Sequence, residues 1–462
     1  MIRNRARPQA SKLAITGWVL FDWACQPYFT LIMTFIYAPY FASAVVGDVT
    51  RGQSLWGFAT AAAGIVIALL SPILGAIADA TGRRKPWIAA FGVLIVLGST
   101  TLWIGKPGDM STVLPVLIAF AIGSIGVEFA TVFNNTMMPM LVPKERIGSL
   151  SGLGWAMGYV GGMISLIFTL AFLASNPETG RTLLGFVPTF GLNAAARESE
   201  RAMGPLTALW FMVFIIPLFL FTPDGKAGKK FLPAIRHGLG AISATIREAR
   251  RHRDLAYFLL ANMIYTDGLI ALFAFGGIYG AGTFGWGTIE LGLFGILLTI
   301  TGTFGAYFGG LLDDRLGAKT VVLGSLAILV VCCFAILSVS RDTILFFVPV
   351  TPLTAGDGIF ASISEQFYVA LGGLIGMAAG PLQAASRTLL VRLAPHDRLA
   401  QFFGLFALSG KLTSFMGPFL VATVTAVTAS QKAGISILVV FFLMGGVLLA
   451  SARISDGNGV RQ

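Results

Sequence analysis

The chain carries one charged turn twice, first as Gly75-Ala-Ile-Ala-Asp79-Ala-Thr-Gly82-Arg83-Arg84-Lys85 and again, 235 positions later, as Gly310-Leu-Leu-Asp313-Asp314-Arg315-Leu-Gly317-Ala-Lys319. Each copy follows a long apolar segment. The glycines, the aspartate and the basic residue occupy the same positions in both turns, so that Arg84 of the first turn corresponds to Lys319 of the second. The spacing is close to half of the 462 residues. A membrane unit that is duplicated in this way is typical of secondary transporters.

The composition places the chain among membrane proteins. Hydrophobic residues make up 56% of the chain and charged residues 11%, whereas ordinary soluble domains contain about 45–50% and about 25%. The three cysteines all fall in apolar stretches, with neither a disulfide framework nor a metal-ligand spacing. No catalytic triad, metal cluster or phosphate-binding loop is visible, so we expect no enzymatic activity and no cofactor.

Twelve apolar segments recur along the chain, and an α-helix needs about 20 residues to cross the hydrocarbon core. We therefore predict an all-α polytopic membrane protein with twelve transmembrane helices in two six-helix, pseudo-symmetric bundles. The first bundle is predicted over 1–222, with helices near 14–43, 55–79, 87–105, 113–138, 150–174 and 205–222. A cytoplasmic linker follows over 223–254, and the second bundle is predicted over 255–462, with helices near 255–282, 288–312, 319–339, 364–388, 401–427 and 433–452.

The basic residues are distributed unevenly between the two sides of the predicted helices. With the N-terminus placed in the cytoplasm, 24 Lys and Arg residues lie on that face, with Arg387 counted in a loop, and 7 lie on the opposite face. The positive-inside rule then predicts that both termini are cytoplasmic, in a bacterial inner membrane. Topology thus accounts for the net charge of +11, and we expect no nucleic-acid partner. The basic stretch 247–253 in the linker is either an amphipathic helix near anionic lipid or a solvated segment.

Each copy of the turn closes the loop between the second and third helices of its half, on the cytoplasmic side. Asp79 and Asp314 beside basic residues can lock one bundle to the other in a single geometry, which predicts a gate. Alternatively, the basic residues only anchor the loop in the cytoplasm, but two copies at equal offset favour the gate. The predicted gating residues are Asp79, Arg83, Arg84, Asp314, Arg315 and Lys319.

Glycines recur at three or four residues on two of the predicted helices. They are Gly154, Gly158 and Gly162 on helix 5, and Gly302, Gly305 and Gly309 on helix 8. Such stripes let helices approach closely. Static packing explains each stripe as well as sliding does.

The turn at Gly75 to Arg84 has the Gly-xxx-Asp-xx-Gly-Arg-Arg pattern of the major facilitator superfamily, and the sequence resembles that superfamily over nearly its whole length. Within it, the chain is similar to the branch of vacuole effluxer-like permeases, related to autophagy-linked amino-acid effluxers of fungal vacuoles. This resemblance implies the major facilitator fold and an amino-acid-like solute, and members of the superfamily often work as monomers. The residues that carry the branch resemblance include Trp18, Asp22, Trp23, Ala24, Asn135, Pro139, Trp155, Asp267, Gly268, Gln383, Ser386, Arg387, Lys411, Gly417 and Pro418.

Ionisable residues inside a membrane span are costly and therefore mark functional sites. Asp22 and Gln26 are four residues apart and share one face of helix 1, and Pro27 is expected to loosen the helix beside that face. Glu128, Thr131 and Asn135 form one stripe on helix 4. We interpret Asp22 and Glu128 as proton-coupling groups, and all five residues as contacts for the substrate. The alternative is a satisfied polar contact or ion pair between helices.

The second half contributes Asp267 on helix 7, a second candidate carboxylate at mid-span, and Lys411 on helix 11. Lys411 is expected either to pair with Glu128 or to bind a substrate carboxylate. Glu365 and Glu290 lie nearer the helix ends, where we expect solvated positions.

We therefore expect a secondary active transporter that moves a small polar or zwitterionic solute by alternating access, coupled to protons. A drug or hydrophobic-cation exporter of the same fold is the alternative that the Phe-rich and Met-rich spans favour. A solute sensor that does not transport and a lipid flippase are two further possibilities. The expected partners are the solute, protons and the lipid bilayer.

Overall fold

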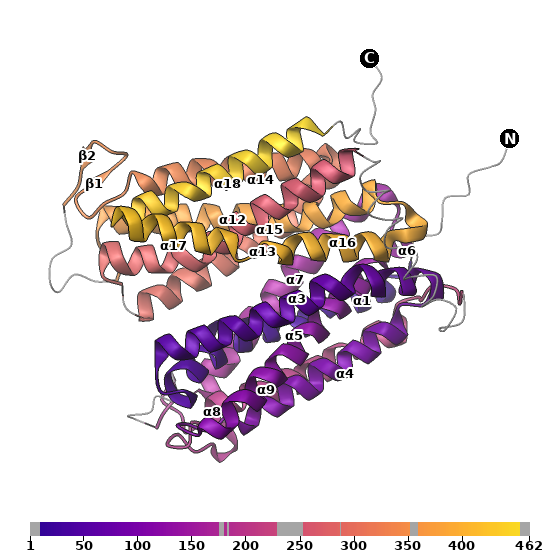
Figure 1. Ribbon diagram of the computed structural model, residues 1–462, viewed down its shortest axis with the longest axis horizontal. Coiled ribbons are helices and arrows are strands. Elements are labelled where there is room, and N and C mark those ends of the chain that lie inside the picture. The colour runs from indigo at the N-terminus through magenta and orange to yellow at the C-terminus, as the bar shows by residue number, and fades with distance from the viewer. Residues whose placement is uncertain are drawn as a thin grey trace. The chain divides into compact units, whose positions relative to one another are not determined.

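A computed structural model describes residues 10–174, 180–182, 184–228, 253–286, 288–351 and 359–452. Within these residues, eleven helical segments are long and apolar enough to cross a membrane. These segments coincide with eleven of the twelve predicted spans. Figure 1 shows the almost wholly helical fold that they form. The predicted amphipathic segment 247–253 lies outside the described residues except for Arg253.

The chain divides into two compact units. Unit 1 comprises residues 1–143, 157–242 and 397–404, and unit 2 comprises 144–156, 243–396 and 405–462. Two helices are therefore shared: each begins in one unit and continues in the other. They are α7 (Ile147–Phe168) and α16 (Leu399–Leu412).

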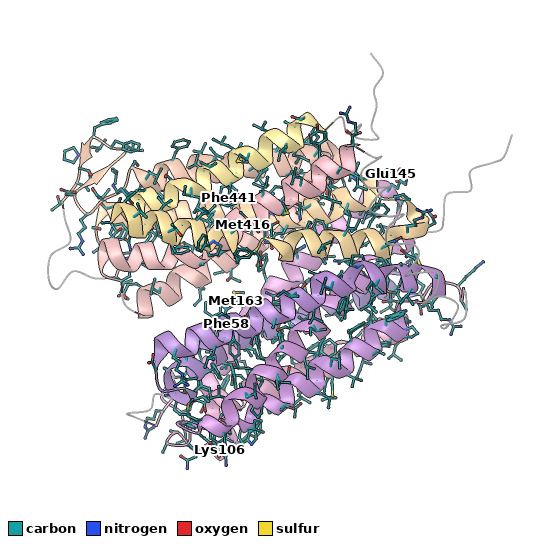
Figure 2. All side chains as sticks on the ribbon, in the orientation of Figure 1. Phe58, Lys106, Glu145, Met163, Met416 and Phe441 are labelled. Carbon is teal, nitrogen blue, oxygen red and sulfur yellow. The ribbon has the colours of Figure 1, made fainter. Side chains whose placement is uncertain are left out.

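Unit 1 is an all-helical bundle. Its helices are α1 (Lys12–Pro27), α2 (Tyr37–Tyr40), α3 (Val49–Thr81), α4 (Lys85–Thr101), α5 (Val113–Asn135), α6 (Met138–Leu141), α8 (Glu198–Arg201), α9 (Met203–Phe214) and α10 (Ile216–Phe221). Segments of π-helix over Tyr28–Phe35 and Phe41–Val45 extend α1 and α2. Large apolar side chains such as Phe58 (73% exposed) coat the bundle, and Lys106 lies in the turn after α4 (Figure 2). This exposed apolar surface suits a lipid environment.

Unit 2 contains most of the helices of the second half of the chain. They are α12 (Arg253–Phe284), α13 (Thr288–Leu316), α14 (Ala318–Leu337), α15 (Ile363–Leu393), α17 (Met416–Thr428) and α18 (Gln431–Ser451). A two-stranded antiparallel hairpin of β1 (Thr343–Ile344) and β2 (Val348–Pro349) connects α14 to α15.

Glycines allow the close helix packing that the stripes predict. On α13, a Cβ at Gly309 would lie 3.0 Å from Pro381 Cα, and one at Gly305 would collide with the backbone at Met377, so α13 packs directly on α15. On α7, a Cβ at Gly162 would lie 2.7 Å from Gln26 Cγ. Both predicted stripes therefore form helix contacts.

One predicted span is divided into two helices by a break of three residues. The span expected over 401–427 consists of α16 and α17, which are separated by residues 413–415, and neither piece alone is long enough to cross a membrane. The physical cause is Pro418, which has no N–H to donate and whose ring crowds the carbonyl four residues earlier, at position 414. The prediction of one continuous helix is therefore wrong, although the segment itself is present.

Candidate functional site

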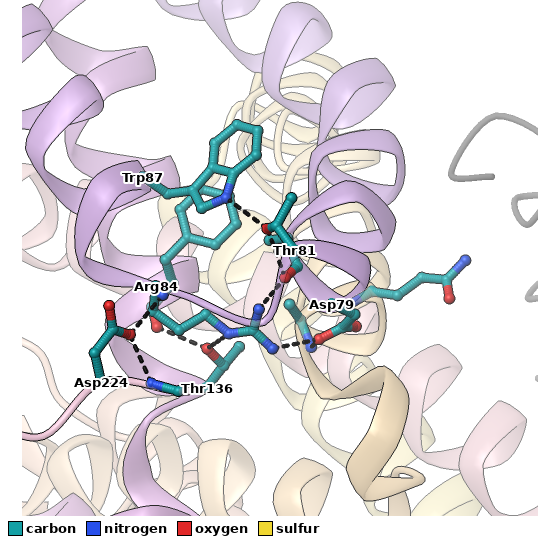
Figure 3. Close-up of polar contacts among 11 residues, drawn as sticks. Asp79, Thr81, Arg84, Trp87, Thr136 and Asp224 are labelled. Atoms are coloured by element: carbon teal, nitrogen blue, oxygen red, sulfur yellow. Dashed lines mark hydrogen bonds and ion pairs between the residues drawn. The ribbon is translucent and has the colours of Figure 1, made fainter. Parts of the chain in front are cut away.

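The first charged turn is organised around Asp79, near the end of α3 (Figure 3). Its carboxylate accepts hydrogen bonds from the backbone N–H of Ala400 (3.1 Å) and Gln401 (2.9 Å), and Arg84 Nη2 lies 2.6 Å from Oδ1. Ala400 and Gln401 belong to the first turn of α16, whose N–H groups have no partner within the helix. The carboxylate thus caps α16 through hydrogen bonds and through the positive end of the helix dipole.

Arg84 fixes the conformation of the loop that carries this carboxylate. Its N–H donates to Asp224 Oδ1 (2.7 Å), its Nε donates to Thr136 Oγ1 (3.1 Å), and its Nη1 donates to the Ala78 carbonyl, as the dashed lines in Figure 3 show. The adjacent Arg83 is exposed. Of the two predicted gating arginines of this turn, Arg84 is the one that contacts Asp79.

The second turn repeats this arrangement inside unit 2. Asp314 accepts hydrogen bonds from the backbone N–H of Gly148 (2.8 Å) and Ser149 (2.9 Å) and from the Ser149 hydroxyl, so it caps the start of α7. Gly310 makes the approach possible, because a Cβ there would lie 2.6 Å from the Gly148 carbonyl oxygen. Gly75 has the same role in unit 1, where a Cβ would collide with the backbone of Ala400.

The two turns differ in the cation that accompanies the carboxylate. Lys319, which matches Arg84 in sequence, instead donates from Nζ to the carbonyls of Ala450 (3.1 Å) and Ala452 (2.7 Å) at the end of α18. It resembles Lys85 of the first turn, which donates to the Phe219 carbonyl in α10 (2.9 Å). The constant offset of 235 residues between the two turns therefore does not identify the residue that does in unit 2 what Arg84 does in unit 1.

Arg392 of α15 supplies the cation of the second turn. It lies 2.8 Å from Asp313 Oδ1 and 4.0 Å from Asp314 Oδ1, whereas Arg315 is exposed. Nothing in the sequence marks Arg392, because it is 78 residues away from Asp314 and outside the repeated turn.

Arg387 is buried within α15, so the expectation that it lies in a loop is wrong. Its Nε donates to Ser151 Oγ (2.9 Å) and its Nη2 to the Ser151 carbonyl (2.6 Å), while the guanidinium lies 6.0 Å from the centre of the Trp155 ring. These contacts fasten α15 to the first turns of α7 inside unit 2.

The candidate transport residues of α1 share one face, as predicted. A Cβ at Gly158 of α7 would lie 3.4 Å from Gln26 Oε1 and 3.5 Å from Asp22 Cβ, so both side chains face that glycine. Beyond Pro27 the chain continues as π-helix, and the Trp23 carbonyl, which Pro27 cannot bond, accepts from Trp210 Nε1 (3.1 Å). The loosening expected at Pro27 is therefore present.

Two hydrogen bonds, one from α1 and one from the π-helix that continues it, join this part of the chain to α5 and set the depth of the candidate residues. Trp18 Nε1 donates to the Asn134 carbonyl (2.8 Å), and the Tyr28 hydroxyl donates to the Phe120 carbonyl (2.7 Å). Asp22 falls between the two bonds on α1, and Glu128 falls between them on α5. The two carboxylates are consequently at similar depth within unit 1.

The other members of the α5 stripe are Thr131, which is half-buried like Glu128, and Asn135. Asn135 is buried, and the Thr131 hydroxyl donates to the Val127 carbonyl of its own helix (2.7 Å). Thr131 therefore has a donor that is already used, which leaves its oxygen lone pairs for a solute.

In unit 2, Asp267 is buried at mid-length of α12. Lys411 lies on α16, and its side chain is outside the described part of the chain. Glu290 is half-buried. Glu365, however, is 2% exposed, with Oε1 accepting from Trp286 Nε1 (2.8 Å) and the carboxylate forming a capping box with Ser362. The expectation of a solvated position is wrong for Glu365, because an aromatic cluster covers the start of α15.

Comparison with known proteins agrees with this geometry. The family described as "Vacuole effluxer Atg22 like" matches residues 45–459. The chain belongs to this family. An uncharacterized MFS-type transporter of Bacillus subtilis, YxiO, is 27% identical over 453 residues, which cover 96% of each chain. Autophagy-related protein 22-2 of Aspergillus clavatus is 24% identical over 287 residues, which cover 60% of this chain and 43% of the fungal protein.

Solved structures identify the fold of this Atg22-like protein. The transporter FucP in its outward conformation matches with a TM-score of 0.66 at 13% identity, covering 96% of this chain and 99% of FucP. A bacterial homologue of the iron transporter ferroportin matches with a TM-score of 0.65 at 15% identity, covering 96% and 99%. Together with the family match and the MFS-type relative, this fold makes the protein an integral membrane transporter of the major facilitator superfamily, which is not an enzyme class.

Proposed function

We propose that this protein is a secondary active transporter that exports a small polar or zwitterionic solute, amino-acid-like in chemistry, from the bacterial cytoplasm by alternating access coupled to protons. The observation that carries the proposal is the polar face of α1 in unit 1. Asp22 and Gln26 face Gly158 there, at the depth of Glu128. The matched family is described as effluxers, and one structural relative is described as a fucose:proton symporter.

The chemistry of these residues fits an ammonium-bearing solute. A carboxylate and an amide on one helix face offer acceptors to an ammonium group and a donor to a carboxylate group. Because an isolated charge inside the membrane is costly, Asp22 and Glu128 are expected to exchange a proton for the solute's positive charge. Substrate contacts would come from Asp22, Gln26, Glu128, Thr131 and Asn135, all of which belong to unit 1.

We further propose that the two charged turns are the gate. Asp79 holds the first turn of α16 in unit 1, and Asp314 holds the first turn of α7 in unit 2. Each of these helices continues in the other unit. Release of either capping carboxylate would therefore remove one of the contacts that hold the start of a shared helix, which is the kind of two-state contact that alternating access requires.

Proton flux in proteoliposomes tests the function. The purified protein is reconstituted with a trapped pH dye, and amino acids, peptides, sugars and cationic drugs are added in turn. We expect flux with amino acids or close relatives, and loss of that flux in Asp22→Asn and Glu128→Gln. The matched control is Glu145→Gln, an exposed carboxylate before α7, which should transport normally.

Three results would contradict the proposal. Flux with cationic drugs alone would favour the exporter of hydrophobic cations. Ligand-induced stabilisation without flux of any solute would favour a sensor. Amino-acid flux that survives in both variants would remove the coupling role from Asp22 and Glu128.

A further inference from the structure

The break in the eleventh predicted span lies at the middle of that span, and a span that crosses the bilayer would carry it near mid-membrane. α16 ends at Leu412 and α17 begins at Met416, so the irregular residues 413–415 divide the segment Leu399–Thr428 almost equally. Non-helical backbone at such a depth is tolerated only where it is buried in protein or lines a polar site. The break therefore needs polar neighbours that satisfy its backbone groups.

Asp267 of α12 lies directly beside this break. A Cβ at Gly417, in the first turn of α17, would collide with the Asp267 carbonyl and would lie 3.2 Å from Ala271 Cβ. Asp267 is also near mid-span, fourteen residues after the start of α12 and seventeen before its end. At about 1.5 Å per residue, both ends of α12 are more than about 20 Å away. All of these residues belong to unit 2.

The polar atoms at this point are incompletely satisfied. Asp267 is 2% exposed, and within the described residues its Oδ1 has no hydrogen-bond partner. The Thr413 side chain interacts with the carboxylate, but its Oγ1 is likewise buried without a hydrogen-bond partner that meets the usual geometry. A buried carboxylate at mid-membrane must be neutralised by a proton or by a cation.

The two helix ends at the break differ in what they offer to a ligand. The last carbonyls of α16 have no helical partner and carry the negative end of the helix dipole. The start of α17 offers few donors, because Met416 N–H already bonds the Thr413 carbonyl (2.7 Å), Phe419 N–H bonds the Phe415 carbonyl (2.9 Å), and Pro418 has no N–H. The break is consequently rich in oxygen acceptors and poor in donors, which favours a cation over an anion.

We propose that Asp267, Thr413 and the terminal carbonyls of α16 form a binding site for a small monovalent cation, and that Na⁺ occupies it. A carboxylate, a hydroxyl and backbone carbonyls are the hard oxygen ligands that such an ion requires. The unwound part of a discontinuous membrane helix is a known place for them to converge. The site deepens the proposed function, on which its role rests, by giving the transporter a second coupling ion.

Thermal stability of the purified full-length chain tests binding without any transport. The midpoint temperature is measured in NaCl and in choline chloride at equal ionic strength, with KCl as a further comparison. We expect a saturable rise in Tm with Na⁺ that choline does not reproduce. Asp267→Asn should abolish this rise, Thr413→Val should weaken it, and Thr413→Ser should retain it. Asp397→Asn, a carboxylate with a 78% exposed side chain, is the matched control and should respond like the parent.

Several results would overturn the site. Two results would mean that the carboxylate is protonated or only packs against its neighbours. The first is a Tm that does not change with Na⁺, and the second is a Na⁺-dependent rise in Tm that persists in Asp267→Asn. If Lys411→Gln lowers Tm and the parent ignores Na⁺, Lys411 is the neutralising cation. A rise with glycine in choline chloride that is lost in Asp267→Asn would assign the carboxylate to the ammonium group of a solute. Because this assay needs no flux, failure of the proteoliposome experiment leaves the Na⁺ result interpretable by itself.

Discussion

Asp79 and Asp314 each provide a carboxylate to the first turn of a helix that is remote in sequence. Replacing either by Asn keeps the size and one acceptor oxygen but removes the charge that the helix end favours. We expect Asp79→Asn and Asp314→Asn each to cost about 0.5–2 kcal/mol, seen as a lower Tm of the purified protein. Asp397→Asn, which precedes α16 with a 78% exposed side chain, should leave Tm nearly unchanged. Equal Tm values for all three variants would show that neither carboxylate stabilises a helix start.

Arg392 allows a sharper test, because its partner Asp313 is almost fully buried. Removing one member of a buried ion pair leaves the other charge uncompensated and typically costs about 3–5 kcal/mol, whereas removing both costs less. We therefore expect Arg392→Gln to lower Tm more than the double variant Arg392→Gln/Asp313→Asn does. Lys319→Gln, at the position that corresponds to Arg84 in sequence, should lower Tm less, because it removes only the hydrogen bonds to the carbonyls at the end of α18. Additive losses in the double variant would contradict the pairing.

At the scale of helices, glycines decide where two backbones can touch. Gly75 on α3 and Gly310 on α13 leave no room for a Cβ, whereas a Cβ at Gly64 on α3 or at Gly292 on α13 would meet nothing within 4 Å. Alanine is favoured over glycine in a helix by about 1 kcal/mol. We expect Gly64→Ala and Gly292→Ala to be neutral or slightly stabilising, and Gly75→Ala and Gly310→Ala to lower Tm. Melting curves of the four variants check this, and a pattern independent of position would refute it.

The sequence predicts helices far better than it predicts their contacts. The span expected at 319–339 is α14 at Ala318–Leu337, because apolar length and charged ends are local properties. The division at residues 413–415 is not apparent from composition, since the segment stays apolar on both sides, although Pro418 is its local cause. The sequence predicts neither the ion pair of Arg392 with Asp313 nor the hydrogen bond of Trp286 to Glu365. Each contact joins residues that are far apart in the sequence and meet only when the chain folds.

For the site, sequence reasoning identifies the residues but not their surroundings. The shared face of Asp22 and Gln26 follows from their spacing, and it is found against Gly158. The capping role of Asp79 and Asp314 does not follow, because spacing says nothing about the remote helices that they meet. The offset of 235 even points to the wrong counterpart of Arg84, since Lys319 binds α18 instead.

For the whole molecule, 24 Lys and Arg residues are counted on one face against 7 on the other, and the excess remains after buried Arg387 is removed, which leaves 23. This excess predicts the orientation in the membrane. The turn after α4, predicted to be outside, contains Lys106, and the turn before α7, predicted to be cytoplasmic, contains Glu145; both residues are marked in Figure 2. We expect Lys106→Cys, in a background without the native cysteines, to react with a membrane-impermeant maleimide in intact cells. Glu145→Cys should react only after permeabilisation. Labelling of Glu145→Cys in intact cells, with Lys106→Cys protected, would reverse the orientation and would place the capping carboxylates Asp79 and Asp314 on the outer side, where a cytoplasmic gate cannot be.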